Sequence, residues 1–432
     1  MALARWIDEC FEGMQRLGHV KALVTIVSPS DPVSLKKLNS QLEDLLAKHV
    51  DVTPGEAAAL SSRSAARRRY AAEDAEGEKA AAAESPSPRR APPELQDFYL
   101  VLDNSLPSAT GNLNRVGFRD SYIPIFGRVL GIISAERHTL TPRGKVLLNL
   151  MTQEEIDGFR VPRRDVNPYK LSLNQQIFFL YCLLDRDGDV LRRLGEKLLS
   201  LDETFSRAEA GRQLGIVFRE MSKVYRRPAQ RGDELATLRR WKEYADAIEN
   251  QKPPSHAGVR EQRVTMRLEA LVDVGLLEKD NPHGFKSYRF SEAGRNFFRV
   301  LSTVETTDGF LRSGFFSAVN EAYGIGAAAL QEIWQVLGAV APSYQVLRSP
   351  LRYAPIEETA LMSAIQLMTS EHKHFFERDH VMGAMLELRR RHPDDIRFNI
   401  DQFGNIRYIK LGETVLSKAT SGNVNFQGND PP

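Results

Sequence analysis

Residues 274–298, VGLLEKDNPHGFKSYRFSEAGRNFF, place a short hairpin between two helices. A glycine precedes two leucines, a polar turn follows, an alternating apolar run returns, and Ser-x-x-Gly opens the next element. Residues 130–148, LGIISAERHTLTPRGKVLL, repeat this order with a shorter turn and with Thr141-Pro142 at the start of the closing helix. Two distant segments with one order of elements predict two copies of one structural unit.

The second copy shows the pattern most fully. Residues 256–274 are predicted to form the helix before the hairpin, because apolar residues recur along one face. The apolar residues on that face are Val264, Leu268, Leu271 and Val272. Gly275 is expected to end this helix, as glycine does just past a helix terminus. The strands are expected to begin at 276–278 and to return over 285–290, and Ser291 is expected to cap the closing helix.

A third segment carries part of the same pattern. Residues 377–411 combine a helix with the run IRFNIDQFGNIRYIKL, which alternates on either side of DQFGN. Such alternation around a glycine-containing turn predicts a β-hairpin. The Ser-x-x-Gly closure is missing, so this third copy is incomplete.

This order of helix, hairpin and capped closing helix resembles the winged-helix superfamily, seen in bacterial regulators and in the target-reading modules of restriction systems. The resemblance implies a mainly α architecture with small β-hairpins, in which two or three winged-helix modules are joined by helical connectors. In such modules the third helix can lie in the DNA major groove while the hairpin touches the backbone. Other winged helices bind only protein, so the fold alone does not decide the function.

The remaining sequence divides at changes in composition. The predicted order is an N-terminal helical segment (1–54), an Ala/Arg/Pro-rich linker (55–93), a first module (94–160), a helical connector (161–250), a second module (251–305), a helical segment (306–354), a third module (355–413) and a disordered tail (414–432). The N-terminal segment is expected to hold helices over 3–17 and 33–48, with ALVTIV at 22–27 as a strand.

Within the connector, two capping boxes predict helix starts, Ser172 with Gln175 and Ser206 with Glu209. Residues 172–250 are therefore expected to be all-helical. The acidic stretch DRDGD at 185–189 lacks a calcium-loop pattern and is interpreted as a turn between helices.

The composition excludes several classes of protein. The formal net charge of +2 over 432 residues requires any nucleic-acid contact to come from local patches. The two cysteines, Cys10 and Cys182, lack metal spacing and predict buried free thiols in a reducing compartment. No signal peptide or membrane-spanning run is expected, which indicates a cytoplasmic protein. The DNA-binding hypothesis given below places it in a prokaryote-like cytoplasm.

The candidate DNA contacts lie in the second module. Arg260, Arg263 and Arg267 recur at i, i+3 and i+7 beside the apolar face, where arginines can pair with guanine edges or phosphates. His283, Lys286 and Arg289 in the hairpin could add backbone contacts. The same stripe could instead dock a protein, or pack its stems on the surface and stay solvated.

The sequence offers no catalytic constellation and implies no cofactor. EHKHFFERDH at 371–380 contains metal-ligand residue types, but their spacing favours a charged, capped helix start. The leading hypothesis is a non-enzymatic protein that binds double-stranded DNA as a regulator or as the recognition subunit of a larger complex. The alternatives are a winged-helix scaffold subunit of a chromosome-organising or defence complex and, third, a metal-dependent nuclease. The DNA or protein target and the oligomeric state do not follow from the sequence.

Overall fold

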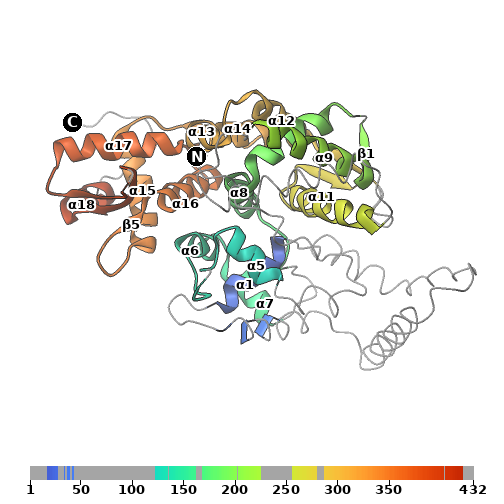
Figure 1. The fold of residues 1–432 in the computed structure, drawn as a ribbon. Helices are drawn as coiled ribbons and strands as arrows, with labels where there is room; N and C mark the ends of the chain where they lie inside the picture. The colour runs from blue at the N-terminus through green and yellow to red at the C-terminus, as the bar shows by residue number, and fades with distance from the viewer. Residues whose placement is uncertain are drawn as a thin grey trace, which may run out of the picture.

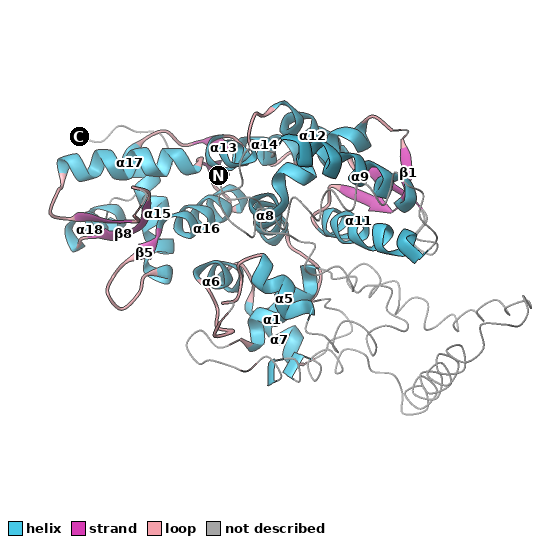
Figure 2. Ribbon diagram, viewed as in Figure 1, coloured by secondary structure: helices cyan, strands magenta, loops and turns pink. Residues whose placement is uncertain are grey.

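The computed structural model describes residues 17–27, 34, 37–38, 41–42, 122–134, 136–161, 168–201, 203–224, 255–279, 287–402 and 404–421. Over these residues the protein is mainly helical, with three small sheets of two or three strands (Figures 1 and 2). This confirms the prediction of a mainly α protein with small β elements. The predicted linker, 55–93, lies outside the described residues.

The N-terminal segment differs from the prediction at 22–27, which was expected to be a strand. Residues up to Ile26 belong to helix α1 (Leu17–Ile26), whose residues 17–24 are all buried. Helix α1 packs against α5 (Tyr122–Val129), α6 (Pro142–Asn149) and α7 (Gln153–Arg160). The prediction was wrong because β-branched residues favour strands only weakly, and burial among helices overrides that preference.

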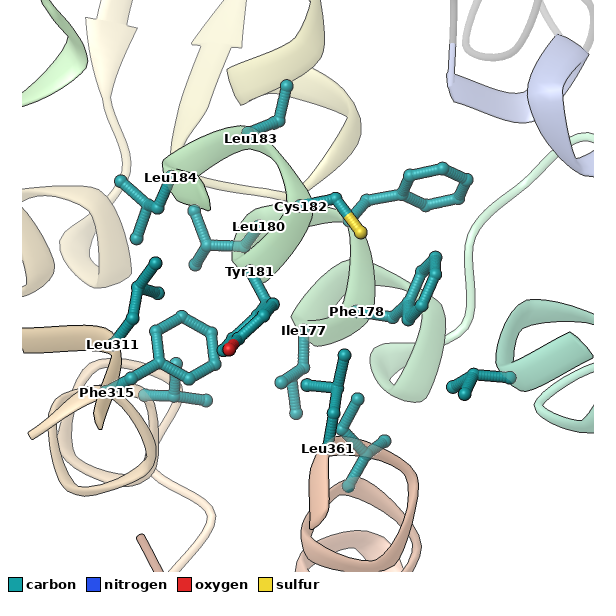
Figure 3. Close-up of a cluster of buried hydrophobic side chains, with 14 of the residues drawn as sticks. Ile177, Phe178, Leu180, Tyr181, Cys182, Leu183, Leu184, Leu311, Phe315 and Leu361 are labelled. Atoms are coloured by element: carbon teal, nitrogen blue, oxygen red, sulfur yellow. The ribbon is translucent and has the colours of Figure 1, made fainter. Parts of the chain in front are cut away.

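Helix α8 (Leu173–Leu199) lies at the centre of the molecule (Figure 1). It contacts α9 (Arg207–Val224), α11 (Ser255–Asp273), α12 (Glu292–Thr303), α13 (Thr307–Ser313) and α16 (Ile356–Thr369). Its apolar residues 177–184 are all buried, and they pack against side chains that include Leu311, Phe315 and Leu361 (Figure 3). Cys182 is a buried free thiol among them, as predicted. The predicted capping box is present, because the Ser172 amide donates to Gln175 at 3.0 Å.

After α8 the chain forms a unit with a three-stranded sheet, which we call the second unit. It comprises β1 (Thr204–Ser206), α9 (Arg207–Val224), α11 (Ser255–Asp273), β2 (Leu277–Lys279), β3 (Ser287–Phe290) and α12 (Glu292–Thr303). The antiparallel pairing of β2 with β3 confirms the predicted hairpin. Strand β1 pairs with the other edge of β3, so the predicted all-helical connector is wrong at 204–206.

The junction between this hairpin and α12 uses each residue of the sequence signature. Gly275 has φ +76°, a conformation that favours glycine. The Ser291 hydroxyl donates to the Gly275 carbonyl at 2.7 Å and accepts from the Gly294 amide at 2.9 Å. A Cβ on Gly294 would lie 1.9 Å from the Leu276 carbonyl oxygen, so only glycine lets α12 approach this closely.

The first copy of the signature, between α5 and α6, repeats these contacts. Gly131 has φ +75°. The Thr141 hydroxyl donates to the Gly131 carbonyl at 2.6 Å and accepts from the Gly144 amide at 3.1 Å. A Cβ on Gly144 would lie 2.2 Å from a backbone oxygen. The two copies therefore share one local structure, although the first hairpin is reduced to a single bridge between Ile133 and Leu140. We call α1 and α5–α7 the first unit.

The third unit repeats the topology of the second. It comprises α15 (Ile333–Leu347), β5 (Ala354–Pro355), α16 (Ile356–Thr369), α17 (Arg378–Arg391), β7 (Ile396–Ile400), β8 (Ile406–Leu411) and α18 (Glu413–Ser421). Strand β5 pairs with β8 and β8 with β7, just as β1, β3 and β2 pair in the second unit. The predicted hairpin is confirmed. The tail was expected to be disordered from residue 414, but α18 buries Val415 and Leu416 there.

Two helices and a small sheet connect these units. Helices α13 (Thr307–Ser313) and α14 (Phe315–Ala322) follow α12, and β4 (Ala328–Ala329) pairs in parallel with β6 (His374–Phe375). The segment 306–354 was expected to be helical, and it also contains β4 and the start of β5. The connection is short, so the second and third units share helical neighbours.

The glycine of the signature can be tested directly. We expect Gly294→Ala to lower the free energy of unfolding by about 1–3 kcal/mol, because the new methyl meets backbone that cannot move aside easily. Gly383→Ala in α17 is the matched control, because a Cβ there has no neighbour within 4 Å. That change should add about 0.5–1 kcal/mol through helix propensity. Urea unfolding compares the two variants. An unaltered midpoint for Gly294→Ala would contradict the close approach of α12 to the Leu276 backbone.

Candidate functional site

Arg267, one of the predicted DNA contacts, lies inside the protein. Its side chain is 1% exposed. Its Nε and Nη2 donate to the two carboxylate oxygens of Asp187 at 2.6 and 3.1 Å, and its guanidinium lies 5.6 Å from the centroid of the Phe218 ring. The prediction that Arg267 contacts DNA is therefore wrong, because its guanidinium is buried in the core and paired with Asp187.

The rest of this part of α11 is equally covered. Every side chain from 264 to 271 is buried, including the polar Thr265 and Glu269. Glu269 accepts from the Tyr288 hydroxyl at 2.8 Å and pairs with Lys279 at 2.9 Å. The C-terminal half of α11 is a central helix of its unit and presents no face to a DNA groove.

The other predicted contacts have different outcomes. Arg289 is exposed on β3, where it pairs with Glu278 of the neighbouring strand at 2.9 Å. Such exposed pairs are weak and leave the guanidinium able to exchange partners. The side chains of Arg260 and Arg263, and residues His283 and Lys286, lie outside what the structure describes. Their contact with DNA stays a prediction.

The partner of Arg267 marks a kink in α8. Asp187 has φ −133° and ψ 16°, which are not helical values, although the helix continues on both sides. The next residue, Gly188, packs so closely that a Cβ would lie 2.2 Å from the Thr307 side chain. The acidic stretch 185–189 was interpreted as a turn between helices, and the structure has a kink there that joins two helical segments of α8. The bend turns Asp187 toward α11.

A second ionic group lies two residues earlier on α8, at Asp185. Arg143 of α6 is buried and contacts Asp185 of α8 at 2.7 Å and Glu357 of α16 at 3.4 Å. Glu357 also accepts from the Tyr181 hydroxyl at 3.0 Å and pairs with Arg378 of α17 at 3.4 Å. This cluster joins the first unit, α8 and the third unit. Its carboxylates face arginines, so we interpret it as a structural joint.

The paired role of these residues was not predicted, although the sequence carried a signal for it. Asp185, Asp187 and Asp189 directly follow the apolar run 177–184 within one helix. Acidic side chains on a buried helix require partners, because an unpaired buried charge is costly. The third of them, Asp189, accepts from the Thr307 hydroxyl of α13 at 2.8 Å. The partners could not be named from the sequence, because they lie on distant elements.

The stretch 371–380 is a capped helix start, as predicted. Glu377 is the N-cap of α17, and its carboxylate also accepts from the amides of Phe316 and Ser317 at 3.2 and 2.8 Å. Burial raises the pKa of Glu377 to about 7. Over the described part of the chain, no three His, Cys, Asp or Glu side chains are grouped as metal ligands.

The third unit presents an open helix and hairpin. The exposed residues of α17 are Asp379, His380, Gly383, Leu386, Arg389, Arg390 and Arg391. On the hairpin, Arg397 lies opposite Lys410 and Asn399 opposite Tyr408, while the alternate residues Ile396 and Ile409 are buried. This pattern turns the polar pairs outward.

Positive charge is concentrated on this surface. Residues 389–411 contain six Lys and Arg and three Asp, a net charge of 6 − 3 = +3, against +2 for the whole chain. Arg390 and Arg391 share Glu387 at 3.3 and 3.0 Å, and Arg407 pairs with Asp401 at 2.9 Å. The surface can therefore attract a polyanion. We call α17 with the outer side of β7–β8 the α17–hairpin surface.

Comparisons with protein-family models, curated proteins and solved structures find no match for this chain. Among the helices that the structure describes, none combines the length and apolar character that a membrane span requires. The assignment of a function therefore rests on the geometry of the chain itself.

The buried pair in α8 gives the first prediction for this region. We expect Asp187→Asn to lower the free energy of unfolding by about 3–5 kcal/mol, because Arg267 keeps a buried charge without its counter-charge. The double variant Asp187→Leu/Arg267→Met removes both charges and should lose less. Urea denaturation measures both, and a double variant less stable than the single one would contradict this account.

The raised pKa of Glu377 gives a second prediction for this region. A folded-state pKa of about 7, above the ordinary 4.5, means that the folded protein holds this proton more tightly than the unfolded chain. The contribution of Glu377 to stability should therefore fall as the pH rises from 4.5 to about 7. Glu377→Gln keeps an acceptor without the charge, so its stability should improve relative to the parent over that range. Unfolding midpoints at several pH values test this, and parallel profiles would contradict it.

Proposed function

We propose that the protein is a non-enzymatic DNA-binding protein built from winged-helix units, and that the third unit supplies a DNA-contacting surface. The observation that carries this proposal is the concentration of net charge +3 on residues 389–411 of an otherwise nearly neutral chain. Local positive charge of this kind provides most of the affinity of proteins for nucleic-acid backbones.

The order of elements supports the winged-helix assignment. Among the described elements, α8, β1, α9, α11, β2–β3 and α12 follow one another in the order helix, strand, helix, helix, hairpin, helix. Apart from β6, the elements α15, β5, α16, α17, β7–β8 and α18 follow the same order. In both the second and the third unit, the short strand pairs with the second strand of the hairpin. By this correspondence α17 occupies the place of the helix that enters the DNA groove, and β7–β8 occupies the place of the wing.

The exposure of α17 favours the third unit over the second. The corresponding helix of the second unit, α11, is buried from 264 to 271, whereas α17 is exposed at seven positions between 379 and 391. We therefore propose that Arg390, Arg397 and Lys410, and not Arg267, make the main contacts with DNA. The first and second units then hold the third in place, and Arg260 and Arg263 remain candidates for a second contact.

The proposed biological role is that of a regulator, or of a recognition subunit whose partner supplies catalysis in a prokaryote-like cytoplasm. A protein of this kind needs no cofactor and no membrane. Attachment to a larger complex would leave the α17–hairpin surface free for DNA.

A duplex titration tests the proposal. The intact protein should bind a labelled duplex at about 50 mM salt, and Arg390→Ala/Arg397→Ala/Lys410→Ala should bind at least about tenfold more weakly, because phosphate contacts are lost. Arg160→Ala/Arg212→Ala is the control, because these arginines are exposed on the other two units. Absence of duplex binding by the intact protein at low salt would refute DNA binding.

A second function has its own support. Leu386, Ile400 and Tyr408 are 45%, 51% and 42% exposed on the same helix and hairpin. Exposed apolar side chains favour a protein-docking scaffold. Such a scaffold would show no duplex binding in the titration above. The third hypothesis, a metal-dependent nuclease, requires cleavage of the duplex that a chelator abolishes.

A further inference from the structure

We infer that the α17–hairpin surface binds the sugar–phosphate backbone of duplex DNA and distinguishes base sequences only weakly. This inference rests on the proposed function and specifies which part of the DNA the third unit contacts. It depends on where the hydrogen-bond donors lie along α17 and the hairpin.

The first part of α17 is poor in the side chains that most often distinguish bases. Helices that enter the major groove contact base edges through their N-terminal residues, most often with Arg, Lys, Asn or Gln. Between 378 and 388 the one residue of these types is Arg378. Its guanidinium pairs with Glu357 at 3.4 Å. The exposed groups there are Asp379 and His380, and Asp379 would repel nearby phosphates.

The middle of the exposed face is equally poor in donors. Gly383 and Leu386 lie one turn apart on it, and a Cβ added at Gly383 would meet no atom within 4 Å. Neither residue has a polar side chain. The part of α17 that would face the floor of a groove can therefore make close contact, but it offers no side-chain hydrogen bond to a base.

The cations lie at the C-terminal end of α17 and on the hairpin. Arg390 and Arg391 occupy the last turn of α17, and Arg397 and Lys410 form a cross-strand pair on the outer side of the hairpin. Positive charge at the C-terminal end of α17 and on the hairpin that follows it, next to a donor-poor helix face, suits contact with backbone phosphates.

The carboxylates near these cations do not prevent this binding. Glu387 holds Arg390 and Arg391, and Asp401 holds Arg407, in ion pairs whose arginines are exposed. Exposed pairs of this kind are weak, and the two anionic oxygens of a backbone phosphate accept from an arginine as a carboxylate does. The arginines can therefore exchange carboxylate for phosphate when DNA approaches.

Competition between duplexes tests the inference. Unlabelled duplexes of equal length and unrelated sequence should displace a labelled duplex from the intact protein with midpoints within about threefold, and binding should fall with salt with a logarithmic slope of about −4 to −5. A sequence that competes about a hundredfold better than the others would overturn the inference while leaving DNA binding intact. Absence of any binding would instead refute the proposed function.

Gly383 allows a second test that does not disturb the fold. Gly383→Glu places a carboxylate at the centre of the exposed face, where space is open, and should weaken duplex binding about tenfold by repulsion. Val161→Glu adds the same charge on the first unit, where Val161 is 64% exposed, and should bind within about twofold of the parent, because it does not lie on the α17–hairpin surface. Unfolding midpoints establish that both variants are folded. If Gly383→Glu binds as well as the parent, DNA does not lie on this surface, and the inference fails even where DNA binding persists through another unit.

Discussion

The buried ion pair between Asp187 and Arg267 is the constraint on which the arrangement of units depends. Removing two charges from water is costly, and these two satisfy each other through a two-pronged contact in the core. The contact coincides with the kink of α8 at Asp187. Because α8 bends there, its first half packs against the first and third units, and its second half serves as the first helix of the second unit. Helix α8 thus contributes to all three units.

The neighbouring acids extend this joint. Asp185 and Asp189 lie two residues on either side of Asp187, and residues two apart on a helix face different directions. They reach Arg143 of α6 and Thr307 of α13, while Asp187 reaches α11. Three short side chains on one turn and a half of helix therefore hold three separate elements. Residues 264–271 of α11 are buried around this joint, whereas α17, which contributes Arg378 to it, keeps an exposed outer face.

The hairpins could be predicted from the sequence because local rules determine them. A positive φ at Gly275 and the Ser291 cap are properties of a few adjacent residues, and the pairing of β2 with β3 follows from them. The burial of Arg267 could not be predicted in this way. A stripe of arginines beside an apolar face looks the same whether the stripe is solvated or covered, and its partner lies 80 residues away. The strand expected at 22–27 failed for the same reason, since surrounding helices decided its conformation.

The second and third units show that one topology can serve two purposes. Charged residues in the C-terminal half of α11 meet buried partners, as Glu269 does with Tyr288 and Lys279. Such pairs fix a helix in one orientation, because any rotation would leave a charge unsatisfied. The outer face of α17 instead carries Gly383, Leu386 and exposed arginines that pair with Glu387. A helix of the first kind stabilises a core, and a helix of the second kind can exchange its partners for those of another molecule. The difference lies in the side chains, and it separates the joint from the binding surface within one repeated fold.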